Sequence, residues 1–399
     1  MSGLPLQQAP LAGSAGEVFR AALRLGLTSF GGPVAHIGYF HDEYVTRRQW
    51  IGAQEFGELV ALSNILPGPS SSQVGIAVGV HRAGKLGGLA AWIGFTLPSA
   101  VILTALAIWA RDADLAGAGW VHGLELAAAA VVLTAVIAMA RTLARGAIKA
   151  AIAIAATAVA LFYPGTFGQV ATLLVAAAVG SYVFRRRVVA LPLTLTFPIS
   201  RRTAIVCAQL FVLLFFVPLW LAGVFSSHSL RLFDSFYSAG ALVFGGGHVV
   251  LPLLNEAVVA PGWVSQQAFL AGYGATQAMP GPLFTFSAYL GAIEDPSPNG
   301  VAGAGIALVA IFLPSFLLLG AALPLWSAAR ERTEIQAAVA GIGAAVVGLL
   351  AAALWNPVLS TSVDGAEDAV VVVALFLLLR FLPPWAVVLI AAVAGAFLF

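Results

Sequence analysis

Apolar residues fill most of the chain in long runs, and short stretches rich in Gly, Pro or charge separate these runs. A helix needs about 20 apolar residues to cross a bilayer. Runs close to that length cover 86–110, 119–144, 203–225 and 334–358, and shorter ones cover 147–163, 166–184, 367–382 and 384–399. The pattern predicts an all-α polytopic membrane protein, because a soluble core could not bury this many apolar helices.

Two further elements, 15–46 and 52–82, are too long and too polar to be single straight spans. The first is interrupted at Ser29-Phe30-Gly31-Gly32-Pro33 and the second at Pro67-Gly68-Pro69. Each proline removes a backbone donor and disfavours helix at the residue before it, and the glycine permits a sharp turn. We therefore predict that one helix ends near Leu66 and that the next begins just after Pro69.

The interrupted pattern occurs twice along the chain. Matching residues stand in the same order and at a nearly constant spacing of a little over half the chain: Phe30-Gly31-Gly32-Pro33 with Phe244-Gly245-Gly246-Gly247, Asp42-Glu43 with Asn255-Glu256, Asn64 with Gln277, Pro67-Gly68-Pro69 with Pro280-Gly281-Pro282, and Leu97-Pro98-Ser99 with Leu313-Pro314-Ser315. Random placement of Gly and Pro would not keep this spacing, so we infer a duplication.

The duplication divides the chain into four parts. Residues 1–14 form an N-terminal tail, 15–187 a first repeat, 188–228 a linker with one transmembrane helix, and 229–399 a second repeat. Each repeat has about six helical elements, including broken or re-entrant helices of the kind found in secondary transporters. Because one linking span joins two repeats with equal numbers of elements, we predict that the second repeat is inverted in the membrane.

Basic residues set the predicted orientation, because they favour the cytoplasmic side of membrane proteins. With re-entrant hairpins and a cytoplasmic N-terminus, every Lys and Arg except Arg111 and Arg231 falls inside. If the broken elements cross fully, Arg47 and Arg48 also move outside. The distribution slightly favours re-entrant hairpins and leaves both versions open. Either version gives a multi-pass protein with its N-terminus inside and its C-terminus outside.

The composition agrees with this class and excludes others. The chain is 60% hydrophobic and 9% charged, whereas soluble domains carry about 25% charged residues. The single cysteine, Cys207, excludes a disulfide framework and a Cys-based metal cluster. A net charge of +2 is too small to indicate a nucleic-acid partner. We expect the lipid bilayer as the surroundings, and no metal, no cofactor and no catalytic residues.

Interrupted helices at membrane depth are tolerated where they line a wet cavity or are buried in protein. A helix start exposes unpaired N–H groups and a partial positive charge, and can hold an anion without a formal charge. The repeats offer four such starts, after Gly32, Pro69, Gly246 and Pro282. We therefore predict an oxyanion site where they converge. Two alternatives stay open: the breaks only shape the bundle, or the glycines only allow close helix packing.

The candidate substrate-binding residues belong to the two sets of breaks. In the first repeat they are Phe30, Gly31, Gly32, Asn64, Pro67, Gly68, Pro69, Ser70, Ser71, Ser72 and Gln73; in the second they are Gly245, Gly246, Gly247, His248, Gln277, Pro280, Gly281, Pro282 and Thr285. Hydroxyl and amide groups in these sets can donate to oxyanion oxygens. The first repeat is the more polar, so we expect it to supply more of the contacts.

Charged or ionisable residues within apolar stretches form a second set, with predicted roles in proton coupling or gating. They are Glu43, Glu55, Glu58, Glu256, His36, Arg20 and Arg24. A carboxylate in poorly hydrated surroundings can carry a proton, and a protonated histidine can hold an anion. The alternatives are interfacial carboxylates in contact with water, packed histidines, and arginines that extend to the membrane surface.

Ser29-Phe30-Gly31-Gly32-Pro33, Leu66-Pro67-Gly68-Pro69, Phe244-Gly245-Gly246-Gly247 and Met279-Pro280-Gly281-Pro282 together resemble the chromate ion transporter family, in its two-domain, long-chain type. The resemblance covers the chain from about Glu17 to the C-terminus. It implies two homologous halves of inverted topology and export of chromate across the bacterial inner membrane, driven by the membrane potential or the proton gradient. The sequence departs from exact internal symmetry at Pro33 against Gly247 and at Ser70 against Leu283.

Several functions stay open from the sequence. The resemblance implies chromate as substrate, but sulfate or another oxyanion has the same shape and charge. A channel would use the same anion site without coupling. An enzyme is not expected, because the chain has no His-Glu-x-x-His motif, no Cys pair and no serine placed beside a histidine on a recognisable scaffold. The oligomeric state stays open, and a homodimer is one option.

Overall fold

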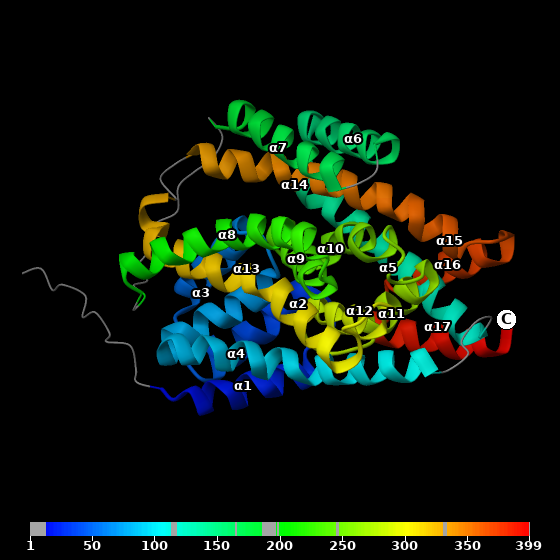
Figure 1. The fold of residues 1–399 in the computed structure, drawn as a ribbon, viewed down its shortest axis with the longest axis horizontal. Coiled ribbons are helices and arrows are strands. Elements are labelled where there is room, and N and C mark those ends of the chain that lie inside the picture. The colour runs from blue at the N-terminus through cyan, green and yellow to red at the C-terminus, as the bar shows by residue number, and fades with distance from the viewer. Residues whose placement is uncertain are drawn as a thin grey trace, which may run out of the picture.

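The structure is a computed structural model that describes residues 13–112, 118–163, 166–185, 197, 199–244, 247–329 and 333–398. All regular secondary structure in these ranges is helical (Figure 1), which confirms the all-α part of the predicted fold class. The predicted N-terminal tail lies almost wholly outside the described residues.

The first half contains seven α-helices and one π-helix among the described residues. They are α1 (Ala15–Thr28), α2 (Gly32–Phe40), η1 (π, His41–Arg47), α3 (Ala53–Ile65), α4 (Ser70–Asp112), α5 (Gly119–Leu143), α6 (Ala147–Phe162) and α7 (Thr166–Val183). The helix α8 (Arg201–Phe225) then leads to the second half.

The second half repeats this order. It contains α9 (His228–Leu242), η2 (3-10, Gly247–Val249), α10 (Val250–Leu254), η3 (π, Asn255–Val259), α11 (Gln266–Gln277), η4 (3-10, Leu283–Thr285), α12 (Phe286–Ile293), α13 (Gly300–Ala329), α14 (Thr333–Ala353), η5 (π, Leu354–Leu359), α15 (Ser360–Ser362), α16 (Ala366–Leu378) and α17 (Pro384–Leu398). Even the π-helices η1 and η3 stand at equivalent places.

The helix boundaries at the first breaks follow the Gly/Pro rules. α3 ends at Ile65 and α4 begins at Ser70, which confirms both predicted ends. α1 ends at Thr28, and α2 begins after Gly31, whose φ of 95° lies in the left-handed region that glycine tolerates. α4 joins the rest of the second broken element to the next apolar run, with non-helical backbone at Ala83 and Gly84 marking the junction.

Small residues bring helices of opposite halves together. α7 packs on α14 where Gly180 meets Gly341, and α17 packs on α5 where Gly395 meets Gly123. A Cβ at any of these glycines would collide with backbone of the facing helix, so the close approach requires glycine. Because α5 corresponds to α14 and α7 to α17, the two contacts are the same contact made twice. In Figure 1, α6 and α7 both lie along α14.

The apolar surface fits a bilayer. Among the described residues, five helices are long and apolar enough to cross one, in the ranges Ser70–Arg111, Gly119–Leu143, Arg201–Phe225, Gly300–Pro324 and Gln336–Ser362. Large apolar side chains on α8, including Phe216 and Trp220, are exposed, as expected where lipid replaces water. The chain is a multi-pass membrane protein with two repeated units.

Candidate solute cavity

The Pro-Gly-Pro breaks are bonded to the glycine breaks of the opposite half. Gly68 donates its backbone N–H to the Val243 carbonyl at 2.7 Å, and Gly281 donates its own to the Ser29 carbonyl at 2.9 Å. Gly68 corresponds to Gly281, and Ser29 to Val243, so the two bonds are equivalent. Each N–H group therefore donates to a backbone carbonyl of the other repeat, and the two bonds fix the positions of the four breaks relative to one another.

Hydrogen bonds from one side chain stabilise the first Pro-Gly-Pro break. Gln73 of α4 donates Nε2 to the Pro67 carbonyl at 2.7 Å and to Ser315 Oγ at 3.3 Å. Ser315 belongs to the Leu-Pro-Ser motif of α13, and its counterpart Ser99 lies beside Gly281. The two Leu-Pro-Ser motifs thus support the Pro-Gly-Pro turn of the opposite half, a role that the sequence did not indicate.

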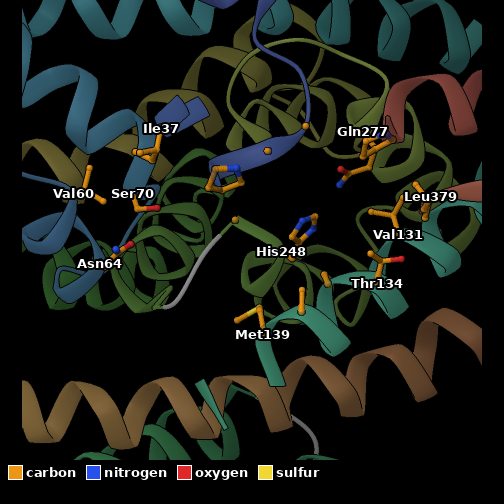
Figure 2. A pocket seen from close by; sticks show the side chains of 17 residues that line it. Ile37, Val60, Asn64, Ser70, Val131, Thr134, Met139, His248, Gln277 and Leu379 are labelled. Carbon is orange, nitrogen blue, oxygen red and sulfur yellow. The ribbon is translucent and has the colours of Figure 1, made fainter. Parts of the chain in front are cut away.

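A cavity of about 470 Å³ lies where the interrupted helices meet (Figure 2). Its lining comes from both repeats: Gly31, Gly32, Pro33, Ile37, Val60, Asn64, Ser70, Val131, Thr134, Ala135, Ala138, Met139, Gly247, His248, Gln277, Leu379 and Pro384. In the view of Figure 2, His248 lies between Asn64 and Ser70 on one side and Gln277 and Thr134 on the other.

The polar groups of the cavity are mostly neutral donors. Asn64 and Gln277 are equivalent residues of the two repeats, and both line it. Gln277 Nε2 is buried, and the Gln277 side chain interacts with the Tyr273 hydroxyl. His248 shares a 2.7 Å hydrogen bond between Nδ1 and the Tyr273 hydroxyl, which fixes the orientation of its ring. Lys, Arg, Asp and Glu are absent from the described lining. An anion in the cavity would therefore meet no negatively charged side chain that repels it and no positively charged one that attracts it.

Two helix starts face the same space. Gly31, Gly32 and Pro33 at the start of α2 line the cavity, as does Ser70, the first residue of α4. The first backbone hydrogen bond of α4 runs from the Gln73 N–H to the Pro69 carbonyl at 2.9 Å. The N–H groups of residues 70–72 lie before this first helical hydrogen bond. These groups and the partial positive charge of the helix start favour an anion here.

Other predicted substrate residues lie behind the cavity wall. Phe30 packs on Trp385 with ring centroids 5.6 Å apart, and Ser71 Oγ pairs with His36 Nδ1 at 3.3 Å. Thr285 donates to the Pro282 carbonyl. The remaining residues outside the described lining are Pro67, Gly68, Pro69, Ser72, Gln73, Pro280, Gly281 and Pro282, which build the breaks instead. Gly245 and Gly246 lie outside the described residues.

The predicted coupling residues are dispersed. Glu55 accepts from the Gly52 N–H at 3.0 Å and caps α3, and Glu58 is 8% exposed on the same helix. Arg20 and Arg24 are exposed on one face of α1.

The aligned pair of acids falls in unlike surroundings. Glu43 is held by two arginines, whereas its counterpart Glu256 lines a separate pocket. Neither lines the solute cavity.

One wall of the solute cavity was not predicted from the sequence. The wall is formed by the middle of α5, which is apolar on all faces there, through Val131, Thr134, Ala135, Ala138 and Met139. Thr134 was the one polar signal in this group, and its hydroxyl already donates to the Ala130 carbonyl at 2.9 Å. An all-round apolar helix has no amphipathic stripe to reveal the face that meets the cavity.

A multi-pass fold with a solute-sized cavity, mostly apolar with a few polar side chains, between the interrupted helices of two repeats defines a membrane protein of the solute-transporter class. The chain belongs to the chromate transporter family: the family model matches it twice, over residues 16–182 and 230–396. This is a transporter family and not an enzyme family.

Relatives match along most of their length. The chain is 29% identical over 346 residues to the chromate transport protein of Pseudomonas aeruginosa, covering 84% of this chain and 79% of that protein. It is 28% identical over 386 residues to the probable chromate transport protein of Synechococcus elongatus, covering 94% and 93%. The chromate transport protein of Cupriavidus metallidurans is 27% identical over 373 residues, covering 90% and 86%. No solved structure matches the chain significantly.

Proposed function

We propose that the protein is a secondary transporter that exports chromate across a bacterial inner membrane, coupled to the membrane potential or the proton gradient. The observation that carries this proposal is the cavity between the repeats, with its amide, hydroxyl and helix-start donors and no described acidic residue. Such a site replaces the hydration of a dianion without attracting cations. The relatives named for chromate transport supply the identity of the ion.

The proposed topology is inverted repeats with a cytoplasmic N-terminus and an external C-terminus. Its support is a pair of equivalent hydrogen bonds, from Gly68 to Val243 and from Gly281 to Ser29. A twofold rotation that exchanges the two halves would turn one of these bonds into the other. One apolar linking helix, α8, would turn the second repeat over. Alternating access would then consist of one repeat tilting against the other around the shared cavity.

Transport by the purified protein tests this function. In proteoliposomes with an imposed membrane potential or pH gradient, chromate should accumulate above its external concentration, and accumulation should stop when the gradient is collapsed. Equilibration without accumulation would indicate a channel. Hydroxyl and backbone donors barely distinguish tetrahedral dianions, so stronger transport of sulfate than of chromate would make sulfate the substrate.

Glu58 is the proposed proton carrier, since it is a buried carboxylate on the helix that leads to the first break. Glu58→Gln should flatten the dependence of chromate transport on pH. Asp364→Asn, at an exposed acid near the start of α16, is the control and should leave that dependence intact. Equal pH profiles for both variants would remove the proton-carrier role.

A further inference from the structure

The two π-helices carry the same carboxylate in different electrostatic surroundings. π-helices are rare and often mark functional sites, and η1 and η3 occupy equivalent places in the two repeats. In η1, Glu43 is 7% exposed and its carboxylate accepts from Arg47 at 3.0 Å and from Arg48 at 2.6 Å. The first copy therefore holds a negative charge that two fixed cations balance.

The second copy lacks these cations. The residues equivalent to Arg47 and Arg48 are Ala260 and Pro261. Glu256 forms no ion pair among the residues that the structure describes. Glu256 is partly buried, and a partly buried carboxylate is costly unless a positive charge or hydrogen bonds compensate it. The second repeat thus keeps the carboxylate but lacks the arginines that pair with it in the first repeat.

Glu256 faces a separate cavity of about 170 Å³ that is rich in oxygen acceptors. Asn255, Gln169 and Asn356 line it, and the Asn356 Oδ1 already accepts from the Ser360 hydroxyl at 3.2 Å. Gln169 is 9% exposed, and its Oε1 has no hydrogen-bond partner among the described residues. This buried acceptor needs a donor or a cation that the described chain does not supply.

The neighbouring groups are arranged as acceptors. Asn255 donates its Nδ2 to Gln266 Oε1 at 2.9 Å, and no hydrogen bond to its Oδ1 occurs among the described residues. Asn356 has non-helical backbone, with φ −139° and ψ 116°, inside the π-helix η5. A break in a helix releases backbone carbonyls, which coordinate alkali cations in other membrane proteins. Three helical segments from distant parts of the chain, α7, η3 and η5, thus bring oxygen atoms to one pocket.

We propose that this pocket binds one monovalent alkali cation, Na⁺, with Glu256 as the charged ligand and the Gln169 and Asn255 oxygens as neutral ligands. Hard cations prefer oxygen ligands, and one carboxylate balances one positive charge, whereas a divalent ion would leave an excess positive charge in the pocket. The bound ion takes the place that Arg47 and Arg48 fill in the first repeat. The site is separate from the solute cavity and does not depend on the transported anion.

Thermal stability of the purified full-length protein in detergent tests the site without any transport assay. Replacing choline chloride with NaCl at constant ionic strength should raise Tm of the wild type by roughly 3 °C at saturation. Glu256→Gln should abolish the rise. Ala260→Arg recreates the i,i+4 ion pair of the first repeat at the exposed turn residue that follows η3, and should raise Tm in choline and remove the response to Na⁺.

Glu367→Gln, at an exposed acid in the first turn of α16, is the charge-matched control and should keep the full response. The proposal is overturned if the wild type shows no response to Na⁺, or if Glu256→Gln keeps it. It is also overturned if protons alone, without Na⁺, produce the stabilisation. Because chromate is absent throughout, failure here would leave the proposed transport function standing.

Discussion

Gly68→Ala and Gly281→Ala should each destabilise the protein by about 2–5 kcal/mol and abolish chromate transport. Gly68 has φ of 118° and Gly281 has φ of 101°, a region that alanine enters only with strain. A Cβ at Gly68 would also collide with Ser315 Oγ, and one at Gly281 would lie 2.8 Å from Ser99 Oγ. Both substitutions displace the N–H that bonds the opposite repeat.

Heat challenge followed by size-exclusion chromatography measures this loss, and proteoliposome uptake measures transport. Gly57→Ala is the matched control, because Gly57 lies in α3 and a Cβ there meets nothing within 4 Å. That variant should be neutral or more stable by up to about 1 kcal/mol. If Gly68→Ala behaves like Gly57→Ala, the interlocked breaks do not hold the two repeats together.

Asn64→Asp and Gln277→Glu should each reduce chromate transport at least tenfold at pH 8. Both residues line the cavity from equivalent positions, and each change adds a negative charge with little change in shape. At 5 Å and an effective dielectric constant of 20, repulsion between a carboxylate and a dianion amounts to roughly 7 kcal/mol. The loss should be smaller at pH 6, where more of the introduced acid is neutral.

Initial rates of uptake over a range of chromate concentrations and pH values check this expectation. Gln54→Glu is the control, because it adds the same charge to an exposed position in the first turn of α3, where a helix tolerates acids. It should transport at the wild-type rate. Unchanged transport by both Asn64→Asp and Gln277→Glu would place the anion path elsewhere.

The local rules for Gly and Pro explain why so much was predictable from the sequence. Pro67 and Pro69 end and restart helices through their own geometry, so the boundaries at Ile65 and Ser70 follow without tertiary information. The duplication was visible for the same reason, because both copies keep these punctuating residues. Asn64, Gln277 and Ser70 were found in the cavity because polar residues beside a break are rare in an apolar chain.

The cavity wall from α5, Leu379 and Pro384 could not be predicted, since the α5 residues lie in an apolar stretch of the helix and Leu379 and Pro384 are themselves apolar. The role of the Pro-Gly-Pro turns also differs in detail from the prediction. They were expected to offer donors to an anion, but the Gly68 and Gly281 N–H groups bond Val243 and Ser29 instead. Backbone pairing between distant segments has no side-chain signature.

The sequence by itself determined the all-α membrane class, the two repeats, the places where helices stop and the polar residues beside those stops, because hydropathy and backbone restrictions act locally. The tertiary structure alone decided which breaks bond to each other, which face of α5 meets the cavity, and which oxygen atoms gather around Glu256. Each of these depends on close approach between segments distant in sequence, and packing, not local preference, sets that approach.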